Sequence, residues 1–258
     1  MSAVFIESMG KGQAIVLVHG FCEDSRVWSE IGPQLAQNHN VILIDLPGFG
    51  KSPLNAADAV ITLEDMAMRL KETLVAKGIN KCTLIGHSLG GYVSLAFAEK
   101  YPKMLNGFGL FHSTASSDTD FKKENRLKHV DFVKRNGIEP FVKTLIPSLF
   151  AAKQANEQQK EKSLQMANQC NVTGVVNALH AMRQRSDRLA VLRESKVPVL
   201  IIAGADDTVV LKKDLAYQAS LPNSCQFELL QNSGHMGMLE EPKRSIEIIN
   251  EFMDLVKN

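Results

Sequence analysis

Short apolar runs alternate along the chain with longer segments whose apolar residues recur at helical spacing. Several of these runs lack polar residues at alternate positions, as expected for strands that are covered on both faces of a sheet. Strands alternating with helices predict an α/β fold built on a mostly parallel sheet flanked by helices. The runs predicted as strands are residues 14–18, 41–44, 82–85, 107–111, 199–203 and 226–230. We also expect an edge strand at residues 4–7, paired through the turn around Gly10 and Gly12.

The clearest predicted helix covers residues 63–77. Thr62 is a suitable N-cap residue, and Asp65 follows three positions later, which is the arrangement of a capping box. The apolar residues of this segment fall on one stripe, and Gly78 suits a left-handed stop at its end. Another helix is predicted from Leu89 to about Lys100, ending before Pro102.

The pattern changes between residues 116 and 188, where strand signals vanish and charged helical stretches follow one another. The predicted helices are residues 121–136, 140–150, 154–169 and a fourth that begins near Thr173. A strand-free segment between two strand–helix blocks predicts a helical insertion over one edge of the sheet. We therefore divide the chain into an α/β core, residues 1–115 and 189–258, and an inserted helical cap (lid), residues 116–188.

Composition narrows the class of protein. The 258 residues carry 29 basic and 28 acidic side chains, so no global field recruits nucleic acid or an anionic membrane. No apolar run approaches the roughly 20 residues of a membrane span, and the first residues do not follow the pattern of a secretory signal. The four cysteines lie far apart without a C-x-x-C pair, so neither a zinc site nor a redox dithiol is predicted. We expect a cytoplasmic protein that needs no metal or cofactor.

One short segment carries a candidate nucleophile. Gly86-His87-Ser88-Leu89-Gly90 follows a predicted strand and precedes a predicted helix. In that context G-x-S-x-G forms a sharp turn that projects the serine hydroxyl at the carboxyl edge of the sheet. The N-terminus of the helix behind Ser88 favours the negative charge that develops during attack on a carbonyl. The simpler alternative is a glycine-rich turn with an incidental serine.

A serine hydroxyl needs a base, and the base needs an orienting acid. His235 follows the last predicted strand, and Asp206 and Asp207 follow the strand at residues 199–203, so all three belong at the carboxyl edge. Composition does not choose between the two aspartates. The oxyanion needs two donors, and we expect the amide of Leu89 and the amide of Phe21, in the turn after residues 14–18, to supply them.

Five segments in order carry a resemblance to a known family: HGFCEDSRVW, DLPGFGKS, GHSLGG, GADDTVV and NSGHMGMLEEP. They resemble the motifs of the α/β-hydrolase superfamily, and within it small capped carboxylesterases and pimeloyl-carrier-protein methyl ester esterases. This resemblance implies Ser88 as nucleophile, His235 as base and Asp207, three residues after Gly204, as acid. It also implies Phe21 and Leu89 as the oxyanion donors. Capped relatives that open epoxides or remove halogen carry an aspartate in place of this serine, which argues against both reactions.

The predicted function is that of a serine hydrolase that cleaves a carboxylic ester of small-to-medium acyl size through an acyl-enzyme. The same residues also suit a thioesterase, an enol-lactonase or a C–C bond hydrolase. A catalytically silent receptor or scaffold of the same fold is the alternative from another class. The side chains expected to line the substrate pocket are His87, His112 and Met236.

We expect a small-molecule ester as the partner of this chain, and neither nucleic acid nor membrane. The lysines of the predicted cap have two interpretations. The simpler one is a solvated helix face, and the sharper one is a docking patch for an acidic carrier protein. The lysines concerned are Lys122, Lys123, Lys128 and Lys134.

Overall fold

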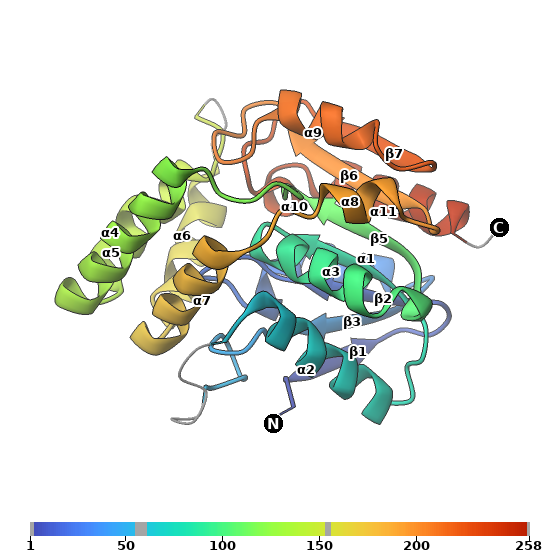
Figure 1. Cartoon of the computed structure of the whole chain (residues 1–258), viewed down its shortest axis with the longest axis horizontal. Helices are drawn as coiled ribbons and strands as arrows, with labels where there is room; N and C mark the ends of the chain where they lie inside the picture. The colour runs from blue at the N-terminus through green and yellow to red at the C-terminus, as the bar shows by residue number, and fades with distance from the viewer. Residues whose placement is uncertain (1–2, 55–60, 153–155, 257–258) are drawn as a thin grey trace.

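The computed structural model describes residues 3–54, 61–152 and 156–256. Within these residues one sheet contains seven strands in the order β1-β3-β2-β4-β5-β6-β7 (Figure 1). All neighbouring strands pair in parallel except β1 and β3, which are antiparallel. The prediction of an α/β fold with a mostly parallel sheet is therefore confirmed. The strands are β1 (Ile6–Met9), β2 (Ala14–Val18), β3 (Asn40–Ile44), β4 (Cys82–His87), β5 (Leu105–Phe111), β6 (Val199–Gly204) and β7 (Cys225–Leu230).

The edge strand differs from the prediction in position and in partner. It covers Ile6–Met9 rather than residues 4–7, and it pairs with β3, where Ile6 lies opposite Ile44. A strand paired through the turn at Gly10 and Gly12 would lie beside β2. Both sides of β2 are occupied by parallel neighbours, β3 and β4, so the antiparallel strand is displaced to the outer side of β3.

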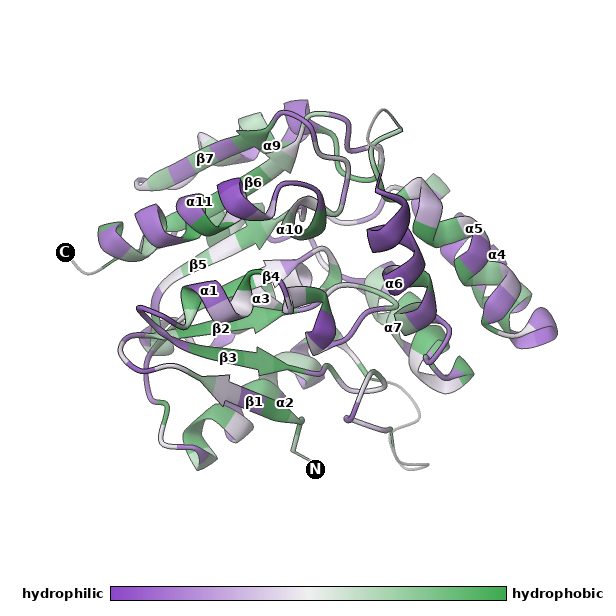
Figure 2. Ribbon diagram, turned by 180° about the vertical axis from the view of Figure 1, so that it is seen from behind, coloured by the Kyte–Doolittle hydropathy of each residue, from purple (hydrophilic) through white to green (hydrophobic). Residues whose placement is uncertain are grey.

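Helices cover both faces of the sheet. In Figures 1 and 2, α2 (Leu63–Ala76) and α3 (Leu89–Lys100) lie on one face, and α1 (Gly32–Leu35) and α11 (Pro242–Leu255) lie on the other. The predicted capping box of α2 is present: the Thr62 hydroxyl accepts from the Asp65 amide, and the Asp65 carboxylate accepts from the Thr62 amide. The remaining short elements are η1 (Ser25–Trp28), η2 (Pro102–Met104), α8 (Leu189–Arg193), α9 (Lys212–Ala219) and α10 (Gly237–Glu240).

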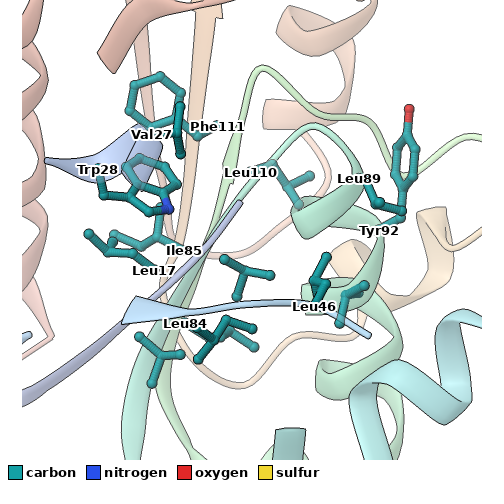
Figure 3. Packing of buried hydrophobic residues seen from close by; sticks show 14 of the residues in the cluster. Leu17, Val27, Trp28, Leu46, Leu84, Ile85, Leu89, Tyr92, Leu110 and Phe111 are labelled. Carbon is teal, nitrogen blue, oxygen red and sulfur yellow. The ribbon is translucent and has the colours of Figure 1, made fainter. Parts of the chain in front are cut away.

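The apolar core lies between the sheet and its helices. Figure 3 shows Trp28 beside Phe111, and their ring centroids are 6.0 Å apart in an edge-to-face arrangement. Trp28 is fully buried, as expected for a packing residue. Because aromatic side chains bury large apolar areas, these contacts fix η1 against the strands that lead into the site.

Four helices follow β5 and precede α8: α4 (Asp120–Asn136), α5 (Glu139–Ser148), α6 (Glu157–Ala167) and α7 (Val172–Gln184). Each agrees to within a few residues with a predicted helix, although residues 154–155 of the third prediction lie outside the described residues. In Figures 1 and 2 the four helices stand together at one side of the sheet. Within the described chain, no helix combines the length and apolar character needed to cross a membrane.

Candidate active site

Ser88 occupies a strained turn between β4 and α3. Its backbone has φ 48° and ψ −111°, a left-handed conformation that residues with a Cβ rarely adopt. The turn is tight because a Cβ at Gly86 would overlap the backbone of Gly90, and one at Gly90 would overlap the backbone of Val18. The Ser88 amide donates to the Phe111 carbonyl at 3.0 Å. The backbone geometry is therefore that of a nucleophile elbow.

The structure distinguishes Asp206 from Asp207. The Nδ1 atom of His235 lies 2.8 Å from Oδ2 of Asp207, and both side chains are buried. The other carboxylate oxygen accepts from the amides of Val209 and Val210 at 2.8 and 3.0 Å. Asp206 is exposed, so Asp207 both contacts the base and accepts the hydrogen bonds of the following turn.

The contact between Asp207 and His235 determines which ring nitrogen of His235 carries a proton. Burial by itself raises the pKa of Asp207, but the adjacent imidazoles of His235 and His112 outweigh it and hold the pKa well below its usual range. An ionised carboxylate only accepts hydrogen bonds, so the Nδ1 atom of His235 carries the proton. The Nε2 atom is then free to act as an acceptor, as a general base requires.

A cavity of about 200 Å³ brings the nucleophile and the base together. Its walls include Ser88, His235, Phe21 and His87 from the sheet side and Leu179 from α7. Within the described residues, the side chains of Ser88 and His235 are not hydrogen-bonded to each other. Such contacts often tighten only when substrate is bound. The arrangement suits attack of a serine on a carbonyl held in this cavity.

The two amides expected to bind an oxyanion lie in suitable backbone settings. Leu89 is the first residue of α3, so its N–H has no acceptor within the helix. Phe21 belongs to the turn after β2, and the next residue, Cys22, has φ 60°. Among the described residues, the non-glycine positions with positive φ are Cys22, Ser88 and His112. Strain of this kind concentrates at functional sites, and of these three residues Ser88 borders the cavity, while Cys22 directly follows Phe21, which also borders it.

Two of the three predicted pocket residues do not border the cavity. His112 is fully buried behind Asp207, where its Nδ1 lies 3.4 Å from the carboxylate and its Nε2 accepts from the Gly237 amide at 3.2 Å. Burial lowers the pKa of His112 to about 4, so its ring is neutral at physiological pH. Met236 is also fully buried. Met236 follows the base and His112 follows the end of β5, but the side chains of both turn into the core; of the three predicted pocket residues, only His87 borders the cavity.

A buried ion pair, not predicted from the sequence, lies behind the base. Glu23 accepts from the Gly20 amide at 2.6 Å and from Nδ1 of His87 at 3.0 Å. The Nε2 atom of His87 donates to the carbonyl of His235 at 2.8 Å. Because both ring nitrogens donate, His87 is an imidazolium. Gly20 permits this approach, since a Cβ there would lie 2.6 Å from His87 Nδ1.

The pair links two parts of the site. Burial disfavours both charges, but Glu23 raises the pKa of His87 above its usual value, and His87 lowers the pKa of Glu23. Glu23 holds the turn of Phe21, and His87 holds the backbone of His235. The pair therefore fixes the position of the turn of Phe21, the expected oxyanion donor, relative to the backbone of His235, the expected base. The only signal in the sequence was a glutamate four residues after His19.

We expect Glu23→Gln to lower the free energy of unfolding by about 3 kcal/mol near pH 6, because breaking a buried ion pair leaves a partner uncompensated. The raised pKa of His87 gives stability that is present below about 6.5, its unfolded value, and lost as pH rises through the folded value. The lowered pKa of Glu23 gives stability present above about 4.3 and lost as pH falls. Denaturant unfolding measured across pH should show the largest difference in stability between wild type and Glu23→Gln from about pH 4.3 to about pH 6.5.

Glu72→Gln is the matched control, since Glu72 is exposed on α2. It should leave the melting curve nearly unchanged at every pH. A Glu23→Gln penalty that is the same at pH 5.5 and pH 9 would contradict a charged Glu23–His87 pair.

A second carboxylate organises the loop that carries the base. One oxygen of Glu240 accepts from the amides of Gly234 and Met236 at 2.9 and 3.1 Å. Its other oxygen accepts from the Ala151 amide at 2.7 Å. The backbone of His235 also donates to the Leu149 carbonyl at 2.7 Å. The loop of the base is thus hydrogen-bonded to Leu149 and Ala151, which lie just after α5.

Comparisons with known proteins agree with this geometry. A family model described as "alpha/beta hydrolase fold" matches residues 13–242. The structure of a thermophilic esterase from Thermogutta terrifontis, with malate bound, has 31% sequence identity and a TM-score of 0.94, covering 99% of this chain and 94% of that chain. A pimeloyl-[acyl-carrier protein] methyl ester esterase from Aeromonas hydrophila is 26% identical over 97% of this chain and 99% of its own length. A putative 2-succinyl-6-hydroxy-2,4-cyclohexadiene-1-carboxylate synthase from Bacillus subtilis is 29% identical over 97% and 94%, respectively.

Proposed function

The chain belongs to the α/β-hydrolase family, and we propose that it is a serine hydrolase that cleaves carboxylic esters of small-to-medium acyl size. The observation that carries this proposal is the buried Asp207–His235 pair at a cavity that Ser88 also borders. The similarity to the Thermogutta terrifontis esterase supports it, because that similarity covers nearly the whole chain.

The proposed reaction proceeds through an acyl-enzyme. The Ser88 hydroxyl attacks the ester carbonyl while Nε2 of His235 takes the hydroxyl proton. Asp207 holds the tautomer of His235 and stabilises the imidazolium that forms. The amides of Phe21 and Leu89 donate to the oxyanion of the tetrahedral intermediate. His235 then protonates the leaving alcohol, and a water activated by the same nitrogen releases the acid and restores Ser88.

We propose that residues 116–188 act as a lid that limits acyl size. Side chains of α5 and α7 form the wall of the cavity opposite Ser88, among them Phe141, Leu145 and Leu179. The ring of Phe141 packs edge-to-face against Phe21, with centroids 6.2 Å apart, so the lid contacts the expected oxyanion turn. A small cavity with this apolar wall favours short acyl chains.

Short acyl esters should be hydrolysed faster than long ones, without activation by an oil–water interface. Phe141→Ala removes a ring from the cavity wall and should raise the ratio of kcat/KM for the decanoate ester over the butyrate by about fivefold or more. The measurement is kcat/KM for 4-nitrophenyl esters of increasing acyl length. Phe132→Ala is the matched control, because Phe132 lies on α4 and is 41% exposed. A preference for emulsified long-chain triglyceride would overturn the lid interpretation.

The surface charge of α4 gives little support to the alternative in which an acidic carrier protein docks on the predicted cap. On α4, Lys123 lies 3.5 Å from Asp120 and Lys128 lies 3.2 Å from Glu124. This face therefore carries mixed charge, whereas an acidic carrier protein would be attracted to a basic one. We propose a small-molecule ester as the substrate, although one relative named above bears the name of a carrier-protein ester esterase.

Thioesters, enol-lactones and C–C bonds are alternatives that the same three residues can cleave, and a non-catalytic scaffold is the alternative outside enzymes. A fluorophosphonate probe separates the classes: we expect labelling of Ser88 in the folded protein. Absence of labelling would favour the scaffold. Initial rates on one ester, one thioester and one lactone of equal acyl size then rank the enzymatic alternatives, and we expect the ester to be the fastest.

A further inference from the structure

The wall of the Ser88 cavity contains an arginine whose charge the proposed chemistry does not use. Arg126 projects from α4 into a wall that is otherwise largely apolar, and its side chain is 19% exposed. The Nη1 atom lies 3.3 Å from the sulfur of Met182, which also borders the cavity. A thioether is a weak acceptor for a guanidinium N–H. Arg126 therefore presents a poorly satisfied donor to the space where substrate binds.

The charge of Arg126 is only partly balanced by its neighbours. Its Nε and Nη2 atoms donate to Asp118, but the same carboxylate also pairs with Nη1 of Arg185 at 2.8 Å. One buried carboxylate thus serves two guanidinium groups, which leaves one positive charge in excess. Arg185 also donates to the carbonyls of Ser116 and Met182, and its guanidinium lies 4.1 Å from the centre of the Tyr92 ring. Figure 3 shows the Tyr92 hydroxyl pointing away from the apolar cluster.

The charged groups at the cavity differ in how fully their charges are balanced. Beside the base, the negative Asp207 contacts the imidazoles of His235 and His112, and the Glu23–His87 pair is neutral as a whole. The Asp118–Arg126–Arg185 cluster keeps one positive charge in excess. A buried excess charge is costly unless a partner compensates it. A ligand that places an anion at Arg126 and its ester at Ser88 would compensate this excess charge, since both residues border the same cavity.

We propose that the preferred substrates are esters that carry a second, free carboxylate, such as half-esters of short dicarboxylic acids, and that Arg126 binds this carboxylate. The inference rests on the proposed ester hydrolysis at Ser88 and specifies its substrate class. A carboxylate matches a guanidinium through charge-assisted hydrogen bonds, which are stronger than neutral ones. The competing explanation is that Arg126 only ties α4 to Asp118. That role would affect charged and neutral substrates alike, so the two explanations are separable.

The experiment compares pairs of substrates of the same shape. Monoethyl succinate, glutarate and adipate are each paired with the ethyl ester in which an isopropyl group replaces the carboxylate, and kcat/KM is measured for each. For at least one pair, wild-type protein should prefer the half-ester. Arg126→Met should lower that preference by about tenfold or more, because the charged contact is lost and the neutral ester is little affected. Arg126→Lys keeps the charge and should retain part of the preference.

Arg135→Met is the matched control, since Arg135 lies exposed on the same helix. It should leave both rates unchanged. Equal losses on both members of a pair in Arg126→Met would assign Arg126 a structural role and overturn the proposal. A wild-type preference for the neutral ester in every pair would also overturn it, whether or not the variant folds. Hydrolysis of the neutral esters in that case leaves the proposed ester hydrolysis intact, whereas no hydrolysis of any ester would reject that function itself.

Discussion

Ser88→Ala should lower ester turnover by several orders of magnitude, up to roughly 10⁶-fold, with the fold nearly unchanged. The hydroxyl oxygen of Ser88 is the atom that forms the acyl-enzyme. Among the described residues that line this cavity, the other side chain with a hydroxyl is Tyr92, on α3. Alanine and serine experience similar strain at φ 48°, so stability should change little. The measurement is kcat on a 4-nitrophenyl ester, with a thermal melt of each protein.

Ser94→Ala is the control on the same helix. The Ser94 hydroxyl donates to the Gly90 carbonyl at 2.9 Å, within the helix rather than toward the cavity. It should leave kcat within a few-fold of wild type. A Ser88→Ala protein that keeps more than a tenth of the activity would remove Ser88 from the role of nucleophile.

Asp207→Asn should lower kcat by about 10³ to 10⁴, the loss that follows removal of the orienting acid in a serine protease. An asparagine can still contact Nδ1 of His235, but it stabilises the wrong tautomer and leaves no negative charge beside the imidazolium. Asp206→Asn is the natural control, because Asp206 is exposed and adjacent in the chain. It should cost less than about tenfold. The comparison is kcat of both variants on one activated ester.

Stability gives a second, independent readout for the same pair of variants. The depressed pKa of Asp207 contributes stability that is present above about 3.9, the unfolded value, and lost as pH falls through the folded value. Asp207→Asn should therefore be less stable than wild type at pH 7, and the gap should narrow below pH 4. If Asp206→Asn instead proves to be the inactive variant, the acid must be reassigned.

The fold was largely accessible from the sequence because its signals are local. Buried parallel strands appear as apolar runs, and the capping box of α2 needs only Thr62 and Asp65 in the right register. The edge strand was placed wrongly because its partner depends on which strand edges are still free once the sheet has assembled. That is a property of the whole topology and has no local signature.

The candidate site likewise has features with a local sequence signal and features that depend on the whole fold. The turn at Gly86, Ser88 and Gly90 could be predicted, because a turn this tight requires small residues two positions before and after the serine. The choice between Asp206 and Asp207 from geometry required the structure, because adjacent residues after a strand turn their side chains to different sides. The strand order that brings the ends of β4, β6 and β7 to one edge explains why the three site residues could be grouped in advance.

The sequence by itself determined the α/β architecture, the elbow at Ser88 and the candidates for base and acid, because each depends on short-range patterning. Only the tertiary structure decided that Glu23 pairs with His87, that His112 turns into the core, and that Arg126 reaches the cavity from α4. These contacts join residues far apart in the chain. They exist only where packing excludes water, and in that low-dielectric setting a single charge or hydrogen bond decides the chemistry.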